Sequence, residues 1–212
     1  MAWDDNYVKD FSKANRGREF EDFINFANSK YQAEGVACMH KVPTEFIPLR
    51  GPHGNVNGCK VNQKSCVDYL GRFRGIPVAV EAKHTRAKRI DFSAVQAHQA
   101  AYLDDWMQTD SGQMAFVCVS FNLNRFFMVP WGFWKAGMEC WELHRRTGEK
   151  ETVTVEQYGW TWKTPGTASV SADDLLPAWE IMTGGRYGLP YLQIIEKIAG
   201  GNKENEDTRP GY

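Results

Sequence analysis

An unbroken apolar segment, Met114–Phe121, is the feature that most constrains how this 212-residue chain can fold. Hydrophobic side chains occupy nearly every position in it instead of alternating with polar ones, which is typical of a strand buried on both faces. We therefore expect this segment to lie in the middle of a β-sheet. Residues 125–129 follow a turn-like segment at 122–124 and end at Pro130, so they predict the next strand.

A second pair of segments, residues 67–73 and 76–83, predicts an antiparallel hairpin closed by a glycine-containing turn. Side chains at positions i and i+2 of a strand project from the same face, so Glu81 and Lys83 share a face. The antiparallel return places Asp68 beside Glu81. Two carboxylates and one ammonium group are therefore expected to meet at one point.

That combination of side chains suits a metal-dependent phosphodiester hydrolase. Carboxylate oxygens are the hard ligands that Mg²⁺ and Mn²⁺ prefer, and such an ion polarises a phosphate and lowers the pKa of a bound water. Lys83 would neutralise charge that develops on the phosphate in the transition state, or help to position the attacking water. Glu and Lys at this spacing also occur on ordinary edge strands, where both are simply solvated, and the spacing alone leaves that alternative open.

The composition fits one globular domain with a substantial core, since 42% of the residues are hydrophobic and 24% are charged. The chain has no secretion signal and no apolar run of about 18 residues, so we expect no membrane association and a cytoplasmic location. Its five cysteines follow no metal-binding spacing and are expected to be reduced thiols. A phosphate-binding glycine loop is absent as well, so no nucleotide cofactor is expected.

The net charge of −1 hides an uneven distribution. Residues 1–99 carry 15 Lys and Arg against 11 Asp and Glu, whereas residues 100–212 carry 10 against 15. A polyanion needs a local basic surface rather than a basic total. The cations near the predicted hairpin, which form either such a surface or a solvated loop, are Arg72, Arg74, Lys83, Arg86, Lys88 and Arg89.

A capping box, with Ser93 as the N-cap and Gln96 three residues later, predicts a helix that runs to about Trp106. His98 and Gln99 are polar residues on its otherwise apolar inner face. They are equally well explained as buried, hydrogen-bonded side chains and as supports of a catalytic site.

Elsewhere the sequence predicts shorter elements. Residues 15–31 have a helical apolar stripe, with Glu21 at its edge. Proline and glycine exclude a long regular element from residues 43–66, and so long a connection within a domain is usually functional or disordered. We also expect strands over 35–39, 152–155 and 159–163, helices over 131–141, 172–182 and 190–199, and a mobile tail over 200–212.

In this order and approximate spacing, the segments resemble the RecU-type Holliday junction resolvases of the restriction-endonuclease-like nuclease superfamily. The resemblance covers about residues 15–130 and is weaker after them. Its motifs are Asn15-Arg16-Gly17, Phe20-Glu21 and Asn25, His40-Lys41-Val42-Pro43-Thr44, Asp68-Tyr69, Glu81-Ala82-Lys83-His84-Thr85 and His98-Gln99.

The resemblance implies an α/β fold with a restriction-endonuclease-like core, in which a mixed central β-sheet is flanked by helices. Residues 43–66 would form a protruding stalk-like loop. Residues 1–199 would form a single nuclease domain, with a C-terminal elaboration over about 131–199. The resemblance further implies a homodimer, which fits the approximate two-fold symmetry of a four-way DNA junction.

Roles for individual residues also follow from the resemblance. Asp68 and Glu81 are expected to bind Mg²⁺, with Mn²⁺ as a substitute, while Lys83 lies at the scissile phosphate. Glu21 is expected to contribute to the metal site and Gln99 to support it, and these five residues form the expected catalytic set. Contacts to DNA are expected from Arg16, Lys41, Arg50, Lys60, Lys64, Arg72, Arg86, Lys88 and Arg89.

The chain departs from the family pattern in two places. The family has Ser-Thr-Thr before the Asp-Tyr pair, whereas this chain has Ser65-Cys66-Val67, so a hydroxyl expected near the metal is missing. The stalk-like segment is also shorter and richer in glycine. These departures bear on junction selectivity more than on phosphodiester hydrolysis.

The leading hypothesis is a dimeric, Mg²⁺-dependent endodeoxyribonuclease that resolves Holliday junctions by paired symmetric nicks in recombination, repair or phage DNA processing. It would work in the cytoplasm of a bacterium or of the bacterial host of a phage. Two alternatives stay open. One is a structure- or sequence-specific endonuclease that acts on other DNA substrates, and the other is a non-catalytic protein that binds junctions through an inactive metal site.

Overall fold

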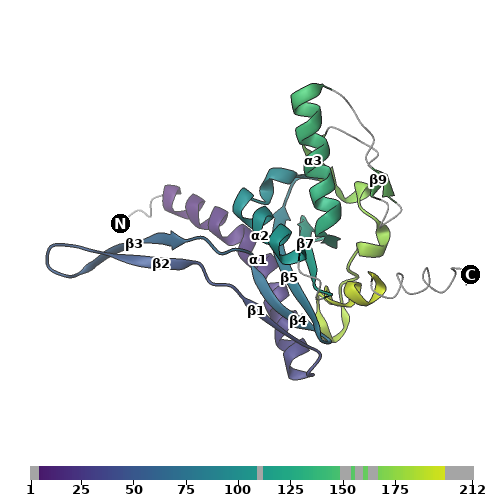
Figure 1. Ribbon diagram of the computed structural model, residues 1–212. Coiled ribbons are helices and arrows are strands. Elements are labelled where there is room, and N and C mark those ends of the chain that lie inside the picture. The colour runs from purple at the N-terminus through teal and green to yellow at the C-terminus, as the bar shows by residue number, and fades with distance from the viewer. Residues whose placement is uncertain (1–4, 109–111, 149–153, 156–159, 162–166, 199–212) are drawn as a thin grey trace, which may run out of the picture.

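A five-stranded sheet forms the centre of the computed structural model, which describes residues 5–108, 112–148, 154–155, 160–161 and 167–198 (Figure 1). In spatial order its strands are β1 (Ala37–Lys41), β4 (Tyr69–Phe73), β5 (Ile76–Thr85), β7 (Met114–Phe121) and β8 (Arg125–Pro130). β5 and β7 run parallel, and the other neighbours are antiparallel. The α/β fold with a mixed central sheet, predicted from the sequence, is therefore confirmed.

β7 is buried as its sequence predicts, because every residue after Met114 is buried. It lies between β5 and β8, while β5 occupies the centre of the sheet. The prediction that β7 is the middle strand was therefore wrong, because β7 is the neighbour of the middle strand. An unbroken apolar run identifies an interior strand but not its position in the order of strands. The predicted turn is present, since the Asn124 N–H donates to the Phe121 carbonyl over 3.0 Å.

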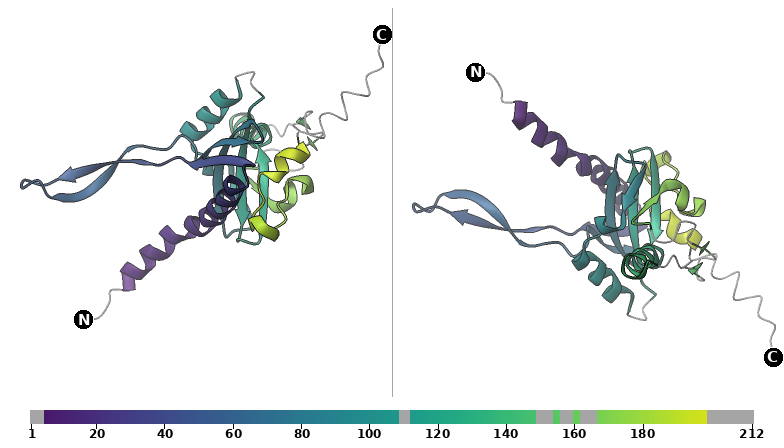
Figure 2. Two further views of the ribbon diagram at one scale, coloured as in Figure 1. Left: turned by 90° about the horizontal axis from the view of Figure 1, so that it is seen from below. Right: turned by 90° about the horizontal axis from the view of Figure 1, so that it is seen from above.

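Helices cover both faces of the sheet (Figure 2). α1 (Asp5–Ala33) lies on one face and is longer than predicted. α2 (Ala97–Met107) and α3 (Trp131–Thr147) lie on the other, joined by a hydrogen bond from Trp131 Nε1 to Asp104 Oδ1 over 2.8 Å. Buried hydrophobic residues from all these elements form one cluster, to which α1 contributes Phe20, Ile24, Ala27 and Tyr31.

The start of α2 differs from the prediction. Phe92–Ala94 form a separate 3₁₀ turn, and Gln96 rather than Ser93 is the N-cap. The capping box consists of Gln96 and Gln99, because each side chain accepts the backbone N–H of the other residue. Gln99 is buried as expected, but His98 is exposed, so its assignment to the inner face was wrong.

β2 (Glu45–Arg50) and β3 (Val56–Gln63) form an antiparallel hairpin that protrudes from the sheet (Figures 1 and 2). We call residues 45–63 the arm. All six residues of β2 are exposed. The prediction that proline and glycine exclude regular structure here was wrong, because the glycines serve the hairpin: Gly54 N–H donates to the Gly51 carbonyl over 2.9 Å in its turn.

Two glycines shape the β1–β4–β5 part of the sheet. Arg74 and Gly75 have φ values of 47° and 88°, the left-handed conformations of a two-residue turn whose twist matches that of the strands. Gly71 pairs with Met39 of β1, and a Cβ atom at position 71 would lie 2.0 Å from the Cys38 carbonyl oxygen. Glycine at position 71 therefore permits the close approach of β1.

Residues 169–181 lie along β6 (Arg89–Asp91) and the β8 edge of the sheet, whereas Tyr187 and Tyr191 pack against Tyr31 of α1. β11 (Ser169–Ser171) pairs with β6, and Ile181 N–H donates to the Phe126 carbonyl over 2.7 Å. This segment therefore covers the edge that β8 would otherwise expose to pairing with other strands.

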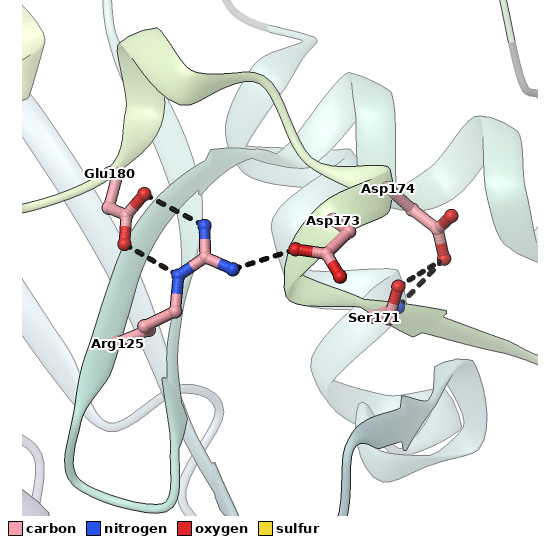
Figure 3. A network of polar contacts seen from close by, with 5 residues as sticks. All are labelled: Arg125, Ser171, Asp173, Asp174 and Glu180. Carbon is pink, nitrogen blue, oxygen red and sulfur yellow. Dashed lines mark hydrogen bonds and ion pairs between the residues drawn. The ribbon is translucent and has the colours of Figure 1, made fainter.

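Arg125, at the start of β8, fixes the same segment (Figure 3). Its guanidinium donates to both oxygens of Glu180, over 2.7 Å and 2.9 Å, and to Asp173 over 2.8 Å. The helix predicted over 172–182 was wrong. Its residues form separate 3₁₀ turns at Ala172–Asp174 and Pro177–Trp179, because Pro177 supplies no N–H for a continuous helix.

The remaining elements are short. β9 (Thr154–Val155) pairs with β10 (Trp160–Thr161), and the rest of the two strands predicted there lies outside the described residues. A 3₁₀ turn covers Gly185–Tyr187, and residues 193–198 are helical. The tail at 200–212 also lies outside the described part. Within that part, no helix has both the length and the apolar character to cross a bilayer.

Candidate active site

Glu81 and Lys83 lie side by side on β5, and Asp68 lies next to them just before β4. Lys83 Nζ is 2.6 Å from Glu81 Oε1. Asp68 Oδ2 accepts a hydrogen bond from the backbone N–H of Ala82 over 2.8 Å, which holds this carboxylate against β5. The structure therefore brings the two carboxylates and the ammonium group together.

The pleat of the strands explains why these side chains share one face. Tyr69 pairs with Val80 and points toward α1, where its hydroxyl donates to Asn25 Oδ1 over 3.1 Å. Asp68 and Glu81 each lie one position away from that pair along their strands. They therefore point to the opposite face, toward α2.

Gln99 of α2 contacts two members of this group. Its Nε2 donates to Glu81 Oε1 over 2.6 Å, and its Oε1 accepts from Lys83 Nζ over 3.3 Å. Gln99 is only 7% exposed. The buried amide therefore fixes the carboxylate and the ammonium group relative to each other.

Glu81 has an incomplete environment. Its side chain is 0% exposed, and Oε2 has no hydrogen-bond partner within the described part of the chain. Burial and, after it, repulsion from Asp68 raise the pKa of the Glu81 carboxyl to about 7, although Lys83 acts in the opposite direction. A buried, unpaired oxygen of this kind costs about 1–3 kcal/mol. A cation or a donor from outside the protein would be stabilised at Oε2.

The donor set of this site fits a hard divalent cation. Glu81 Oε2 and the Asp68 carboxylate are oxygen ligands of the type that Mg²⁺ and Mn²⁺ prefer. Among the described residues, no three His, Cys, Asp or Glu side chains form a group that could hold a metal ion. The protein would thus contribute two carboxylates, and water and phosphate oxygens would fill the other coordination positions.

Glu21 lies apart from this group, on α1. Its Oε2 is 2.5 Å from Lys41 Nζ at the end of β1, and both side chains are partly exposed. The two residues line an open hollow together with Gly17, Arg18, Asp22 and Asn25. The expected contribution of Glu21 to a metal site stays a prediction.

The comparison with protein families shows to which family the chain belongs. The family model described as "RecU: Recombination protein U" matches residues 15–164, which contain the whole five-stranded sheet, the arm and the carboxylate site. The chain belongs to the RecU family.

Individual RecU proteins match along most of the chain. The Holliday junction resolvase RecU of Streptococcus thermophilus is 28% identical over 197 residues, which cover 89% of this chain and 87% of that protein. Its namesake in Lactobacillus delbrueckii subsp. bulgaricus is 25% identical over 210 residues, covering 95% and 89%. Among solved structures, the Holliday junction resolvase Hjc of Archaeoglobus fulgidus is 12% identical with a TM-score of 0.35, over 53% of this chain and 77% of that one.

The unusual residues before Asp68 in this RecU chain belong to the interior. Val67 is 0% exposed within the hydrophobic core. Cys66 is partly buried and interacts with the Tyr102 hydroxyl of α2, which raises the pKa of that tyrosine after the larger effect of burial. The family hydroxyl at position 67 is therefore replaced by apolar packing beside Asp68.

The cations predicted to contact DNA fall into two groups. All eight whose side chains are described are exposed. One group is also held by side chains of the protein: Lys41 by Glu21, Lys64 by Gln96, and Arg89 by Ser169 and Asp174. The other group consists of Arg50, Lys60, Arg72, Arg86 and Lys88. The side chain of Arg16 lies outside the described part of the structure.

Two contributors to this RecU site were missed at the level of sequence. One is the backbone N–H of Ala82, which carries no sequence signal. The other is Gln96, whose backbone N–H donates to Gln99 Oε1 over 3.0 Å. Gln96 and Gln99 have the spacing of a capping box, so this second contributor could have been found.

Proposed function

We propose that this RecU family member is an endodeoxyribonuclease that resolves Holliday junctions. One observation carries the proposal: Asp68, Glu81, Lys83 and Gln99 form a connected group in which one buried carboxylate oxygen is left unpaired among the described residues. The names of the RecU relatives supply the substrate, a four-way DNA junction.

The two carboxylates would hold Mg²⁺ or Mn²⁺. When bound, such an ion polarises the scissile phosphate and lowers the pKa of a bound water. Glu81 can present only Oε2, because Oε1 already accepts from Gln99 and Lys83. Asp68 is oriented by the Ala82 N–H, so the ligand positions are set before DNA binds.

Lys83 supplies positive charge beside the carboxylates. Its ammonium group has three donors, and Glu81 and Gln99 take two of them, which leaves one for a phosphate oxygen. Its side chain is 17% exposed, so its charge acts with little screening by water. Lys83 would stabilise the negative charge that develops as the phosphodiester bond is hydrolysed.

A second copy of the chain and the arm belong to the same proposal. Two copies related by a two-fold axis would place two carboxylate sites on opposed strands of the junction and give paired nicks. The arm protrudes from the sheet (Figure 2) and would reach toward the junction centre, as the resemblance to RecU implies.

Cleavage of synthetic DNA tests the proposal. With Mg²⁺, the purified protein should introduce symmetric nicks into a four-way junction, and Asp68→Asn should abolish them. Linear duplex, flap and fork substrates run beside the junction. Equal cutting of linear duplex would support an endonuclease with another substrate, and tight junction binding without cleavage in Mg²⁺ or Mn²⁺ would support a non-catalytic binding protein.

Metal binding can be measured without any substrate. A ligand that binds the folded state alone, at a few times its Kd, stabilises that state by about 1 kcal/mol. Mg²⁺ should therefore raise the melting temperature of the wild-type protein but not that of Asp68→Asn. An equal shift in both proteins would place the binding site elsewhere.

A further inference from the structure

The base of the arm is connected to the carboxylate site by hydrogen bonds. Lys64 follows the last residue of β3, and its Nζ donates to Gln96 Oε1 over 3.0 Å. Gln96 is the N-cap of α2, and Gln99 in the first turn of that helix contacts Glu81 and Lys83. Two residues, Gln96 and Gln99, therefore separate the arm from the site.

Gln96 determines which way the Gln99 amide faces. The Gln96 backbone N–H donates to Gln99 Oε1 over 3.0 Å, and Lys83 Nζ donates to the same oxygen over 3.3 Å. Were the amide flipped, its NH₂ group would meet these two donors, and its oxygen would face the Glu81 carboxylate. Only the observed orientation lets Gln99 donate to Glu81 Oε1.

The Gln96 side chain joins this arrangement to the arm. Its Oε1 accepts the backbone N–H of Gln99 in the capping box and also accepts from Lys64. Gln96 and Lys64 are both exposed, so DNA at the base of the arm can contact them. A lysine ammonium has three donors, and Lys64 can therefore bind a phosphate oxygen while it holds Gln96.

We propose that Gln96 is a positioning residue that couples the base of the arm, through Lys64, to the orientation of Gln99 and so to Glu81 and Lys83. This inference rests on the proposed nuclease function. It assigns to Gln96 a part in the reaction beyond that of a helix cap: contact of DNA with the arm would reinforce the active arrangement of the carboxylate site.

Substitutions at position 96 separate the coupling from simple capping. Gln96→Ser keeps an N-cap oxygen for the Gln99 N–H, but the side chain is too short to accept from Lys64 as well. Gln96→Glu keeps both acceptor interactions and places a negative charge at a helix N-terminus, where it is favourable. Lys64→Met removes the donor alone. Gln108→Ser makes the matched change at the exposed C-cap of the same helix.

Single-turnover junction cleavage then tests the coupling. Gln96→Ser and Lys64→Met should each lower the rate at saturating junction about fivefold, the scale of one lost hydrogen bond, and the double variant should lose no more than either one. Lys64→Met should also raise KM, whereas Gln96→Ser should not. Gln96→Glu should restore the rate, and Gln108→Ser should match the wild type.

A measurement without DNA isolates the structural link. The side-chain amide signals of Gln99 in a ¹⁵N NMR spectrum should move in Lys64→Met and stay in place in Gln108→Ser. Unmoved signals in Lys64→Met, a wild-type rate in Gln96→Ser or additive effects in the double variant would each overturn the coupling while junction cleavage by the wild type stands. A wild type that cleaves no junction would instead remove the proposed function, and this inference with it.

Discussion

Two carboxylates of this protein, Glu81 and Glu180, are held in opposite ways. Both oxygens of Glu180 accept from Arg125, and this pairing lowers the pKa of the Glu180 carboxyl (Figure 3). Glu81 is deeper, one of its oxygens is unpaired among the described residues, and burial raises its pKa. The protein itself completes the environment of Glu180, whereas we propose that a bound cation completes that of Glu81.

The difference separates Glu180, a carboxylate that joins segments of the chain, from Glu81, which we propose to be a metal ligand. Glu180 connects the C-terminal segment to β8, and the side chains of Glu180 and Arg125 are 26% and 36% exposed, so water and salt weaken their pairing. Glu81 joins no distant segments through a charged partner, since Lys83 is its neighbour on β5. Removing either carboxylate should therefore affect a different property of the protein.

The largest expected effect is on cleavage. Glu81→Gln and Asp68→Asn should each reduce the single-turnover rate on a junction by at least about 10³-fold, because each removes a carboxylate that we propose to hold the metal at the reacting phosphate. Glu81→Gln should be at least as stable as the wild type toward urea, since a neutral amide replaces a buried carboxylate. A Glu81→Gln variant that cleaves normally would contradict the proposed role of Glu81 in the reaction. A variant that unfolds more easily than the wild type would show that Glu81, like Glu180, stabilises the fold.

The opposite pattern is expected at Arg125. Arg125→Met leaves Glu180 and Asp173 without their partner and should lower the free energy of unfolding by about 2 kcal/mol. Cleavage per folded molecule should stay at the wild-type level. The matched control is Arg145→Met, which removes an exposed i,i+3 pair with Glu142 and should change stability by less than about 0.5 kcal/mol. Equal decreases in the free energy of unfolding of the two variants would mean that the Arg125 network stabilises the fold no more than an exposed ion pair does.

The smallest expected effect concerns pH. The folded protein holds the pKa of Glu180 below its ordinary value of 4.5, so its contribution to stability is present above that value and is lost as pH falls through the lower, folded-state pKa. The stability difference between wild type and Glu180→Gln, from urea unfolding, should shrink by about 0.5–1 kcal/mol as pH falls from about 6 to 3. A difference that stays constant would show that the ion pair does not stabilise the fold.

The carboxylate site was predictable because it depends on local rules. Strand alternation places Glu81 and Lys83 on one face, and the two-residue turn at Arg74 and Gly75 fixes the register that brings Asp68 to them. Buried β7 was likewise evident from its unbroken apolar sequence. In each case the signal lies in a few neighbouring residues: the alternation of a strand for the carboxylate site, and an apolar run without alternation for β7.

The errors arose where contacts between residues far apart in the sequence determine the local structure. Ser93 is by intrinsic preference a better N-cap than Gln96, but the helix begins after Gln96, whose partner Gln99 is held by Glu81 of a different element. The pairing of Glu21 with Lys41, which was not predicted, joins positions 20 residues apart and has no sequence period, while the metal role expected of Glu21 stays a prediction. In the arm, Pro48 breaks no helix or central strand, because a two-stranded hairpin has open edges that tolerate a missing N–H.

Both ends of the arm enter the protein beside Asp68, one of the two carboxylates that we propose to be catalytic. Val42, ahead of β2, donates its N–H to the Asp68 carbonyl over 2.8 Å, and Lys64, after β3, lies four positions before Asp68. Residues gained or lost at the tip, between Arg50 and Val56, therefore alter only how far the protein extends. The length of this projection could therefore differ between substrates of different shape without a change in the carboxylate site that we propose for hydrolysis.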